Sequence, residues 1–208
     1  SEMCIRDRPT REVSVLKLKY KAVIFDMDGT LIDAQDWHYL ALNEALEIFG
    51  ASIPHAEHRE KFDGLPTRVK LQMLTDEGRL PQHVHQVVSE VKQERTLRYV
   101  SSRAFPRVEQ LLMMSWLKKN NLKMAVATNS IKSSAQTMLA SVGILPFLDV
   151  LVSNEDVTKA KPDPEMYNLT AKLLGLEPAE CLVIEDHDIG VQAGVAAGPT
   201  VGCQLAHQ

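Results

Sequence analysis

Two carboxylates with one residue between them follow a short apolar segment near the beginning of the chain. Asp26 and Asp28 come directly after Ala22–Phe25, whose length and composition are typical of a buried strand. In an extended strand both side chains would point the same way, and their charges would repel. A divalent cation between them would remove that repulsion, and Mg2+ prefers oxygen ligands. The spacing therefore predicts a metal-assisted site at the carboxyl end of this strand.

The same segment, Asp26 to Thr30, has two simpler interpretations, a turn and the start of a calcium-binding loop. An EF-hand loop needs further oxygen ligands and a closing glutamate within about twelve residues. The next residues are Leu31 and Ile32, whose side chains carry no oxygen. The calcium loop is therefore disfavoured, and a plain turn remains open as the alternative.

Two further stretches contain polar residues that could take part in a site. Thr128 and Asn129 follow the predicted strand of residues 123–127 and are expected to open a helix, where a hydroxyl and backbone N–H groups can bind phosphate. Their alternative role is that of a helix N-cap. Lys161 stands beside Pro162 in a predicted loop, and its alternative is a solvated side chain.

A second pair of acids follows residues 181–184, another apolar segment of strand length. Glu185 and Asp186 could bind a cation or could cap the helix that follows, since a helix N-terminus favours negative charge. Asp188 fits the capping role better, so we assign capping to Asp188.

Strands and helices alternate in most of the chain, which predicts an α/β fold with a doubly wound, Rossmann-like parallel sheet. Between the first strand and the rest lies a long stretch with helical periodicity only. We therefore expect an all-helical cap at residues 34–103, inserted into a catalytic core of residues 19–33 and 104–208. The expected strands are residues 22–25, 123–127, 150–153, 181–184 and 200–203.

The composition excludes several classes of protein. The chain has 208 residues, 45% hydrophobic and 24% charged, which is ordinary for a globular protein. Its net charge of -4 argues against a general nucleic-acid binder. No apolar run reaches the roughly 18 residues of a membrane span. Three cysteines without metal-ligand spacing favour a cytoplasmic location.

The segment from Asp26 to Thr30 resembles the DxDGT signature of the haloacid dehalogenase-like phosphotransferase superfamily. Thr128, Lys161 and Glu185 with Asp186 stand in the order of that family's later motifs. The glycines and alanines after Asp186 resemble the "EDS..G..AG..AG" pattern of the β-phosphoglucomutase-like subfamily, which carries a helical cap. His187 replaces the usual small residue of that pattern.

The resemblance implies a role for each candidate. Asp26 would be the nucleophile that becomes phosphorylated, and Asp28 the general acid and base. Thr128, Asn129 and Lys161 would bind phosphate. Two cap residues would contact substrate, His38 near the hinge and Arg68 in a loop that closes over the site; a structural histidine and a surface arginine are the alternatives. The implied metal ligands for Mg2+ are Asp26, Asp28, Glu185 and Asp186.

The implied activity is that of a Mg2+-dependent phosphatase acting on a small phosphorylated metabolite, in particular a sugar phosphate, in a monomeric protein. A β-phosphoglucomutase is the alternative, although Thr30 stands where that mutase has valine. Dehalogenases of the family lack an acid at the position of Asp28. Phosphonate hydrolases need a cap lysine, and Lys61, Lys70 and Lys92 give no convincing match. A non-catalytic or truncated binding protein of the same fold is the alternative of another class.

The two ends of the chain suggest that the sequence is not entirely native. Residues 3–7, Met-Cys-Ile-Arg-Asp, resemble the translation of a sequencing-adapter tag, so we treat residues 1–18 as a tail outside the fold, with a native tail as the alternative. Relatives continue past the apolar residues 200–203, so a missing C-terminal segment is expected.

Overall fold

The computed structural model describes residues 19–203, so the predicted tail and residues 204–208 lie outside the described residues. Five parallel strands form one sheet in the order β3-β2-β1-β4-β5. This arrangement confirms the predicted α/β, Rossmann-like fold. The strands are β1 (Ala22–Phe25), β2 (Lys123–Ala127), β3 (Val150–Val152), β4 (Cys181–Glu185) and β5 (Thr200–Cys203).

β1 is the central strand, and all four of its residues are buried. Its last residue, Phe25, pairs with Val126 of β2 on one side and with Ile184 of β4 on the other. The three strands therefore end nearly level with one another. Polar residues that follow them meet at the carboxyl edge of the sheet, which is where ligands bind in open α/β folds.

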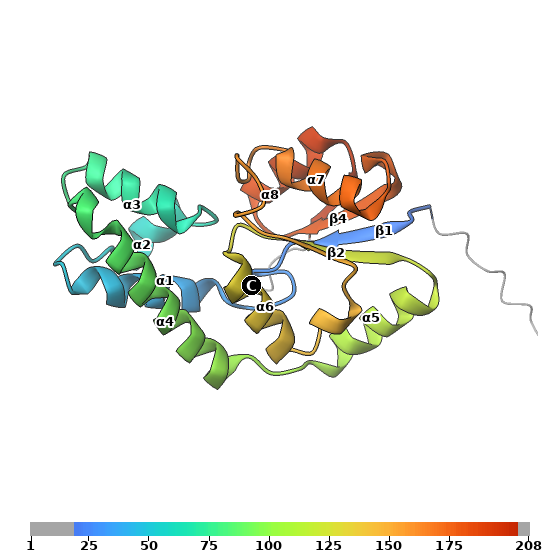
Figure 1. The fold of residues 1–208 in the computed structure, drawn as a ribbon, viewed down its shortest axis with the longest axis horizontal. Helices are drawn as coiled ribbons and strands as arrows, with labels where there is room; N and C mark the ends of the chain where they lie inside the picture. Colours follow the sequence, from blue (N-terminus) through green and yellow to red (C-terminus); the bar gives the residue numbers. More distant parts are fainter. Residues whose placement is uncertain (1–18, 204–208) are drawn as a thin grey trace, which may run out of the picture.

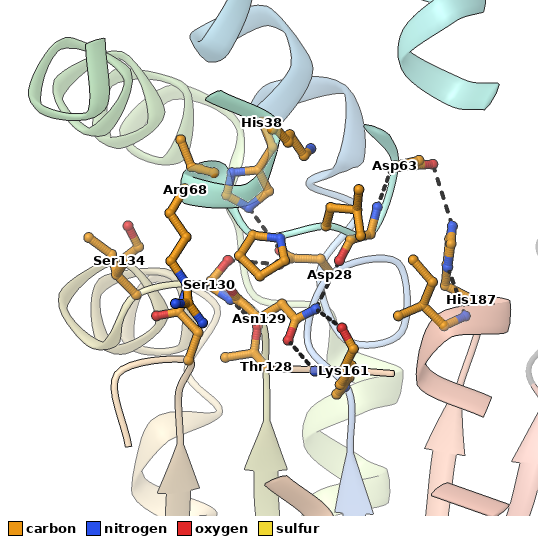
Figure 2. Close-up of a pocket in the computed structure, with 18 of the residues that line it drawn as sticks. Asp28, His38, Asp63, Arg68, Thr128, Asn129, Ser130, Ser134, Lys161 and His187 are labelled. Atoms are coloured by element: carbon orange, nitrogen blue, oxygen red, sulfur yellow. Dashed lines mark hydrogen bonds and ion pairs between the residues drawn. The ribbon is translucent and has the colours of Figure 1, made fainter. Parts of the chain in front are cut away.

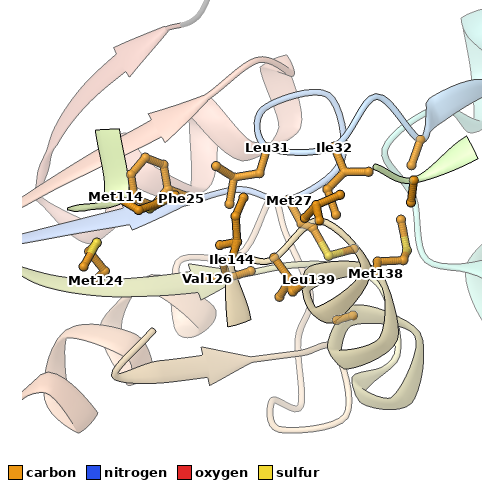
Figure 3. Close-up of a cluster of buried hydrophobic side chains, with 14 of the residues drawn as sticks. Phe25, Met27, Leu31, Ile32, Met114, Met124, Val126, Met138, Leu139 and Ile144 are labelled. Carbon is orange, nitrogen blue, oxygen red and sulfur yellow. The ribbon is translucent and has the colours of Figure 1, made fainter. Parts of the chain in front are cut away.

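Helices cover both faces of the sheet (Figure 1). Phe25 and Val126 point into a core formed with α5 (Val108–Lys119) and α6 (Lys132–Ser141), part of which is drawn in Figure 3. Ile24 points to the opposite face, into a core formed with two helices that come later in the chain. Those helices are α7 (Glu165–Leu174) and α8 (Asp188–Ala197).

Residues 34–103, here called the cap segment, are helical and lie beyond the carboxyl ends of the strands (Figure 1). The segment has a hydrophobic cluster of its own, which includes Leu42, Phe62 and Leu74. Its division from the core at residues 34 and 104 stays a prediction. Its elements are α1 (Gln35–Glu47), α2 (His55–Glu57), the π-helical turn His58–Phe62, α3 (Thr67–Asp76), the 3-10 turn Gln82–Val84 and α4 (His85–Arg103).

One helix begins later than the sequence suggested. Thr128 and Asn129 were expected to open the helix after β2, but α6 starts at Lys132 and its N-cap is Ile131. Residues 128–131 form a loop between strand and helix instead. Among residues 19–203, no helix is long and apolar enough to cross a membrane.

Candidate active site

A cavity of about 450 Å3 opens between the carboxyl edge of the sheet and the cap segment. This volume suits a small metabolite. Its walls bring together eight of the nine residues singled out from the sequence, and the ninth, Asp186, neighbours them. The eight are Asp26, Asp28, His38, Arg68, Thr128, Asn129, Lys161 and Glu185, of which Figure 2 labels all but Asp26 and Glu185.

The buried ammonium group of Lys161 contacts three oxygen atoms on the sheet side of the cavity. The Nζ of Lys161 donates to Asp26 Oδ1 at 2.7 Å, to Glu185 Oε1 at 2.6 Å and to the carbonyl oxygen of Ala127 at 2.8 Å. Tyr167 donates its hydroxyl proton to the same Glu185 oxygen. Lys161 is 4% exposed, so these charges attract strongly in a weakly polarisable surrounding. The alternative of a solvated side chain is therefore wrong, although Lys161 does lie in the predicted loop.

The charge balance around Asp26 is unusual for a carboxyl group. Burial raises the pKa of Asp26 to about 8, Lys161 opposes the rise, and the acids Glu185 and Asp28 add to it. Burial lowers the pKa of Lys161, but the neighbouring Asp26, Tyr167 and Glu185 outweigh burial and hold that pKa well above its usual value. Lys161 therefore stays charged, while a further cation is needed to keep Asp26 ionised at neutral pH.

Three carboxylates could supply that cation site. Asp26, Glu185 and Asp186 each offer an oxygen, and these oxygens lie within 4.8 Å of one another. Glu185 Oε2 is buried and has no hydrogen-bond partner among the described residues. An orphaned carboxylate oxygen beside two others fits a hard cation such as Mg2+. Asp186 is held in place by Gln35 Nε2 at 2.9 Å and Thr30 Oγ1 at 3.3 Å.

Asp28 lies outside this carboxylate group, in a turn after the end of β1. Its carboxylate accepts a hydrogen bond from Ser130 Oγ at 3.0 Å and pairs with His38 Nε2 at 3.1 Å (Figure 2). On the other side of the ring, Lys92 Nζ lies 3.1 Å from His38 Nδ1. An ammonium can only donate, so Nδ1 accepts and Nε2 carries the proton that is donated to Asp28.

This chain of contacts sets the charge of Asp28. Burial raises the pKa of Asp28, but His38, Ser130 and Lys92 together outweigh burial and bring the pKa below its ordinary value. Burial and Lys92 lower the pKa of His38, so the ring is neutral near pH 7. Ser130 and Lys92 belong to the site although sequence reasoning did not select them. Ser130 could have been found from its place beside Asn129.

The loop after β2 forms hydrogen bonds with the cap segment and with the loop that contains Lys161. Asn129 Nδ2 donates to the Gly64 carbonyl at 2.9 Å, and Asn129 Oδ1 accepts from the Lys161 backbone N–H at 3.2 Å. Thr128 Oγ1 accepts from the Ser130 backbone N–H at 3.0 Å. The Thr128 hydroxyl proton is thus available to the cavity, whereas the Asn129 amide is engaged with the cap segment.

One capping assignment was wrong. Asp188 is the first residue of α8, and the N-cap is His187, whose Nδ1 accepts from the Ile189 backbone N–H at 3.2 Å. The His187 ring also lies 4.0 Å from Asp63 Oδ2, in the cap segment (Figure 2). A histidine at a position that the pattern fills with a small residue therefore contacts the cap loop.

The cap side of the cavity carries three cationic side chains. Arg68 is exposed at the start of α3 and extends toward residues 128–130 (Figure 2). Lys92 contacts His38. Lys70 is buried, and its Nζ lies 3.1 Å from Nε2 of His58, which is also buried. Sequence reasoning weighed Lys70 only as the cap lysine of a phosphonate hydrolase and did not connect it with His58, because two residues twelve positions apart carry no shared signal.

Comparison with known proteins identifies the family. The model of the haloacid dehalogenase-like hydrolases matches residues 23–203. A fructose-1-phosphate phosphatase of Escherichia coli (strain K12) is 31% identical over 181 residues, which cover 86% of this chain and 94% of that protein. A β-phosphoglucomutase of Bacillus subtilis (strain 168) is 28% identical over 186 residues, covering 86% of this chain and 80% of that protein.

A solved structure supports the same fold. The crystal structure of a β-phosphoglucomutase from Clostridium difficile superimposes with a TM-score of 0.76 at 24% sequence identity. The match covers 88% of this chain and 83% of that one. At this identity the likeness supports the fold alone.

Proposed function

The chain belongs to the haloacid dehalogenase-like hydrolase family, in its β-phosphoglucomutase-like branch, and we propose that it is a Mg2+-dependent phosphatase of small sugar phosphates. The observation that carries this proposal is the pairing of two aspartates in different surroundings. Asp26 sits among carboxylates and Lys161, while Asp28 sits between His38 and Ser130. Carboxylates that differ in this way suit the roles of nucleophile and acid–base group.

Asp26 is the proposed nucleophile. Its carboxylate oxygen would attack the phosphorus of the substrate, forming an aspartyl-phosphate as the bond to the sugar oxygen breaks. Lys161, 2.7 Å away, offsets the charge of the ionised carboxylate. Mg2+, held by Asp26, Glu185 and Asp186 with the backbone carbonyl of Asp28, would supply positive charge toward the phosphoryl oxygens when bound.

Asp28 is the proposed acid and base. As general acid it would give a proton to the departing sugar oxygen, and as general base it would then take a proton from the water that hydrolyses the aspartyl-phosphate. Its lowered pKa keeps Asp28 ionised in the free protein, which is the form that a general base needs. The negative phosphoryl group of a bound substrate would raise that pKa toward the value an acid needs. Thr128 and Ser130 would position the phosphoryl oxygens.

The relatives support a carbohydrate substrate. The Escherichia coli protein is named for fructose 1-phosphate, and a Thermotoga maritima relative, 30% identical over 179 residues, is named a phosphorylated carbohydrates phosphatase. The Bacillus subtilis relative keeps a mutase as the second candidate, which would return the phosphoryl group to a sugar instead of water. The monomeric state and the cytoplasmic location stay predictions.

The test is phosphate release from a panel of sugar phosphates with Mg2+. The native chain is compared with Asp26→Asn, and with Asp36→Asn as a control whose side chain is exposed on α1. We expect Asp26→Asn to lower kcat by roughly a thousandfold or more and the control to match the native chain. Release that survives Asp26→Asn refutes the proposal. Interconversion of glucose 1-phosphate and glucose 6-phosphate without release selects the mutase.

A further inference from the structure

Lys70 is a buried lysine whose ammonium lines the cavity on the cap side. It lies in α3 and is 7% exposed, and its Nζ is 3.1 Å from Nε2 of His58, which is 4% exposed. The ammonium can only donate, so His58 accepts at Nε2 and keeps its own proton on Nδ1. This contact uses one of the three N–H bonds of the ammonium. The other two have no hydrogen-bond partner among the described residues.

Among the described residues, no carboxylate pairs with Lys70 or with the neighbouring Lys92, whereas Lys61 and Lys161 each have carboxylate partners. Among residues 19–203, Lys61 pairs with Glu57 and Glu77, and Lys161 pairs with two acids, but no carboxylate oxygen lies within 4.0 Å of Lys70 Nζ. A buried charge without a counter-ion is costly and is rarely kept without a reason.

The acids that influence Lys70 are already engaged elsewhere. Asp63 accepts from the Gly64 backbone N–H and lies near His187, while Asp28 contacts His38 and Ser130. Burial and the nearby ammonium of Lys92 lower the pKa of Lys70 to about 8, and the two acids only partly oppose this. The ammonium is therefore still charged at neutral pH, and an anion would stabilise it.

We propose that Lys70, held in place by His58, is a specificity-determining subsite for a second anionic group of the substrate. That group is a second phosphate or a carboxylate on the sugar, and the inference rests on the proposed function. The first phosphate would face Asp26 at the sheet side, and the second anion would face the cap segment. Arg68, which the family resemblance suggested as a substrate contact, is exposed, so Lys70 offers the better shielded charge.

The test compares binding of singly and doubly anionic sugars. Isothermal titration calorimetry uses the full chain with Asp26→Asn and Mg2+, so that the chemical step is blocked. The probes are fructose 1-phosphate and fructose 1,6-bisphosphate for a second phosphate, and glucose 6-phosphate and 6-phosphogluconate for a carboxylate. Lys70→Met removes the charge at similar length, Lys70→Arg keeps it, and Lys61→Met is the matched control on the surface of the cap segment.

We expect at least one doubly anionic probe to bind about 10- to 100-fold more tightly than its singly anionic partner, as charge-assisted hydrogen bonds allow. Lys70→Met should reduce this ratio to about one without changing the affinity for the singly anionic probe. Lys70→Arg should keep part of the ratio, and Lys61→Met all of it. The pair that shows the ratio identifies the second anion as phosphate or carboxylate.

Three results would overturn the inference. The first is an affinity ratio near one for both probe pairs in the protein that keeps Lys70. The second is a ratio that Lys70→Met leaves unchanged. The third is an equal loss of affinity for both members of a pair in Lys70→Met, which would indicate a structural role. Because the affinity ratio is measured without turnover, the Lys70 proposal can be refuted while the phosphatase proposal stands. Absence of phosphate release by the native chain would refute the activity and leave the binding ratio as a separate result.

Discussion

Replacing Lys161 by methionine tests the charge balance of the site most directly. The ammonium of Lys161 is buried against Asp26, Glu185 and the carbonyl of Ala127. Methionine fills similar space but leaves the buried carboxyl groups of Asp26 and Glu185 without their cation. Removing one partner of a buried ion pair costs about 3–5 kcal/mol of unfolding free energy. We expect Lys161→Met to lose about that amount at neutral pH.

The loss should depend on pH, with a sign that the structure determines. Burial raises the pKa of Asp26 to about 8, so the stability linked to this proton is complete below the ordinary value of 3.8 and is lost as pH rises through 8. Without Lys161 the folded-state pKa of Asp26 rises further. The gap between native and variant should therefore widen from neutral pH to about pH 9.

The assay is urea unfolding followed by circular dichroism, with ΔG extrapolated to water at each pH. Lys159→Met is the matched control, because Lys159 lies in the same loop with its side chain 72% exposed. The control should change stability by less than about 0.5 kcal/mol. Mg2+ should recover part of the loss in Lys161→Met by binding the carboxyl groups that Lys161 no longer contacts. A loss below about 1 kcal/mol, or one that stays constant with pH, would refute the reasoning.

Three further results are expected. Gly190→Ala should abolish Mg2+-dependent stabilisation in thermal denaturation, because a Cβ there would lie 1.9 Å from the buried carboxylate of Glu185; unchanged stabilisation would contradict this packing. Lys92→Met should lower kcat by about 10- to 100-fold and move the acidic limb of the pH–activity profile to higher pH. The reason is that Lys92 orients His38 and helps to lower the pKa of Asp28. An acidic limb at the same pH in the variant would exclude this coupling between Lys92 and Asp28. Burial lowers the pKa of Lys70 to about 8, so between pH 8 and 10.5 the unfolded chain holds more protons than the folded chain, and Lys70 makes the unfolding free energy rise with pH. Lys70→Met should remove this contribution and make the rise less steep than in the native chain. An equally steep rise in the variant would place the pKa of Lys70 near its ordinary value.

The strands were predictable because of where they lie. β1, β2 and β5 have the predicted bounds, and β3 and β4 differ by one residue at an end. Strands of a covered parallel sheet are buried on both faces and therefore read as short continuous apolar runs. The helix after β2 was placed too early because Thr128 and Asn129 are favourable N-cap residues, although the chain needs a loop before α6.

The candidate residues at the strand ends were predictable for a related reason. The carboxyl ends of neighbouring parallel strands meet at one edge, so polar groups that follow separate strands converge without any knowledge of side-chain packing. This argument brought Asp26, Glu185 and Asp186 together from positions far apart in the chain. It could not assign the N-cap of α8 to His187, because that depends on the turn by which the chain leaves β4.

The amino-acid sequence by itself therefore determined the family, the α/β class and the acids at the sheet edge, because these follow from local apolar runs and from motifs of a few residues. Only the tertiary structure decided the electrostatics of the cap side. The contacts of Lys92 with His38 and of Lys70 with His58 join positions 54 and 12 residues apart on different elements of the cap segment. Such pairs depend on how α1, α3 and α4 pack together, and no local pattern in the sequence specifies that packing.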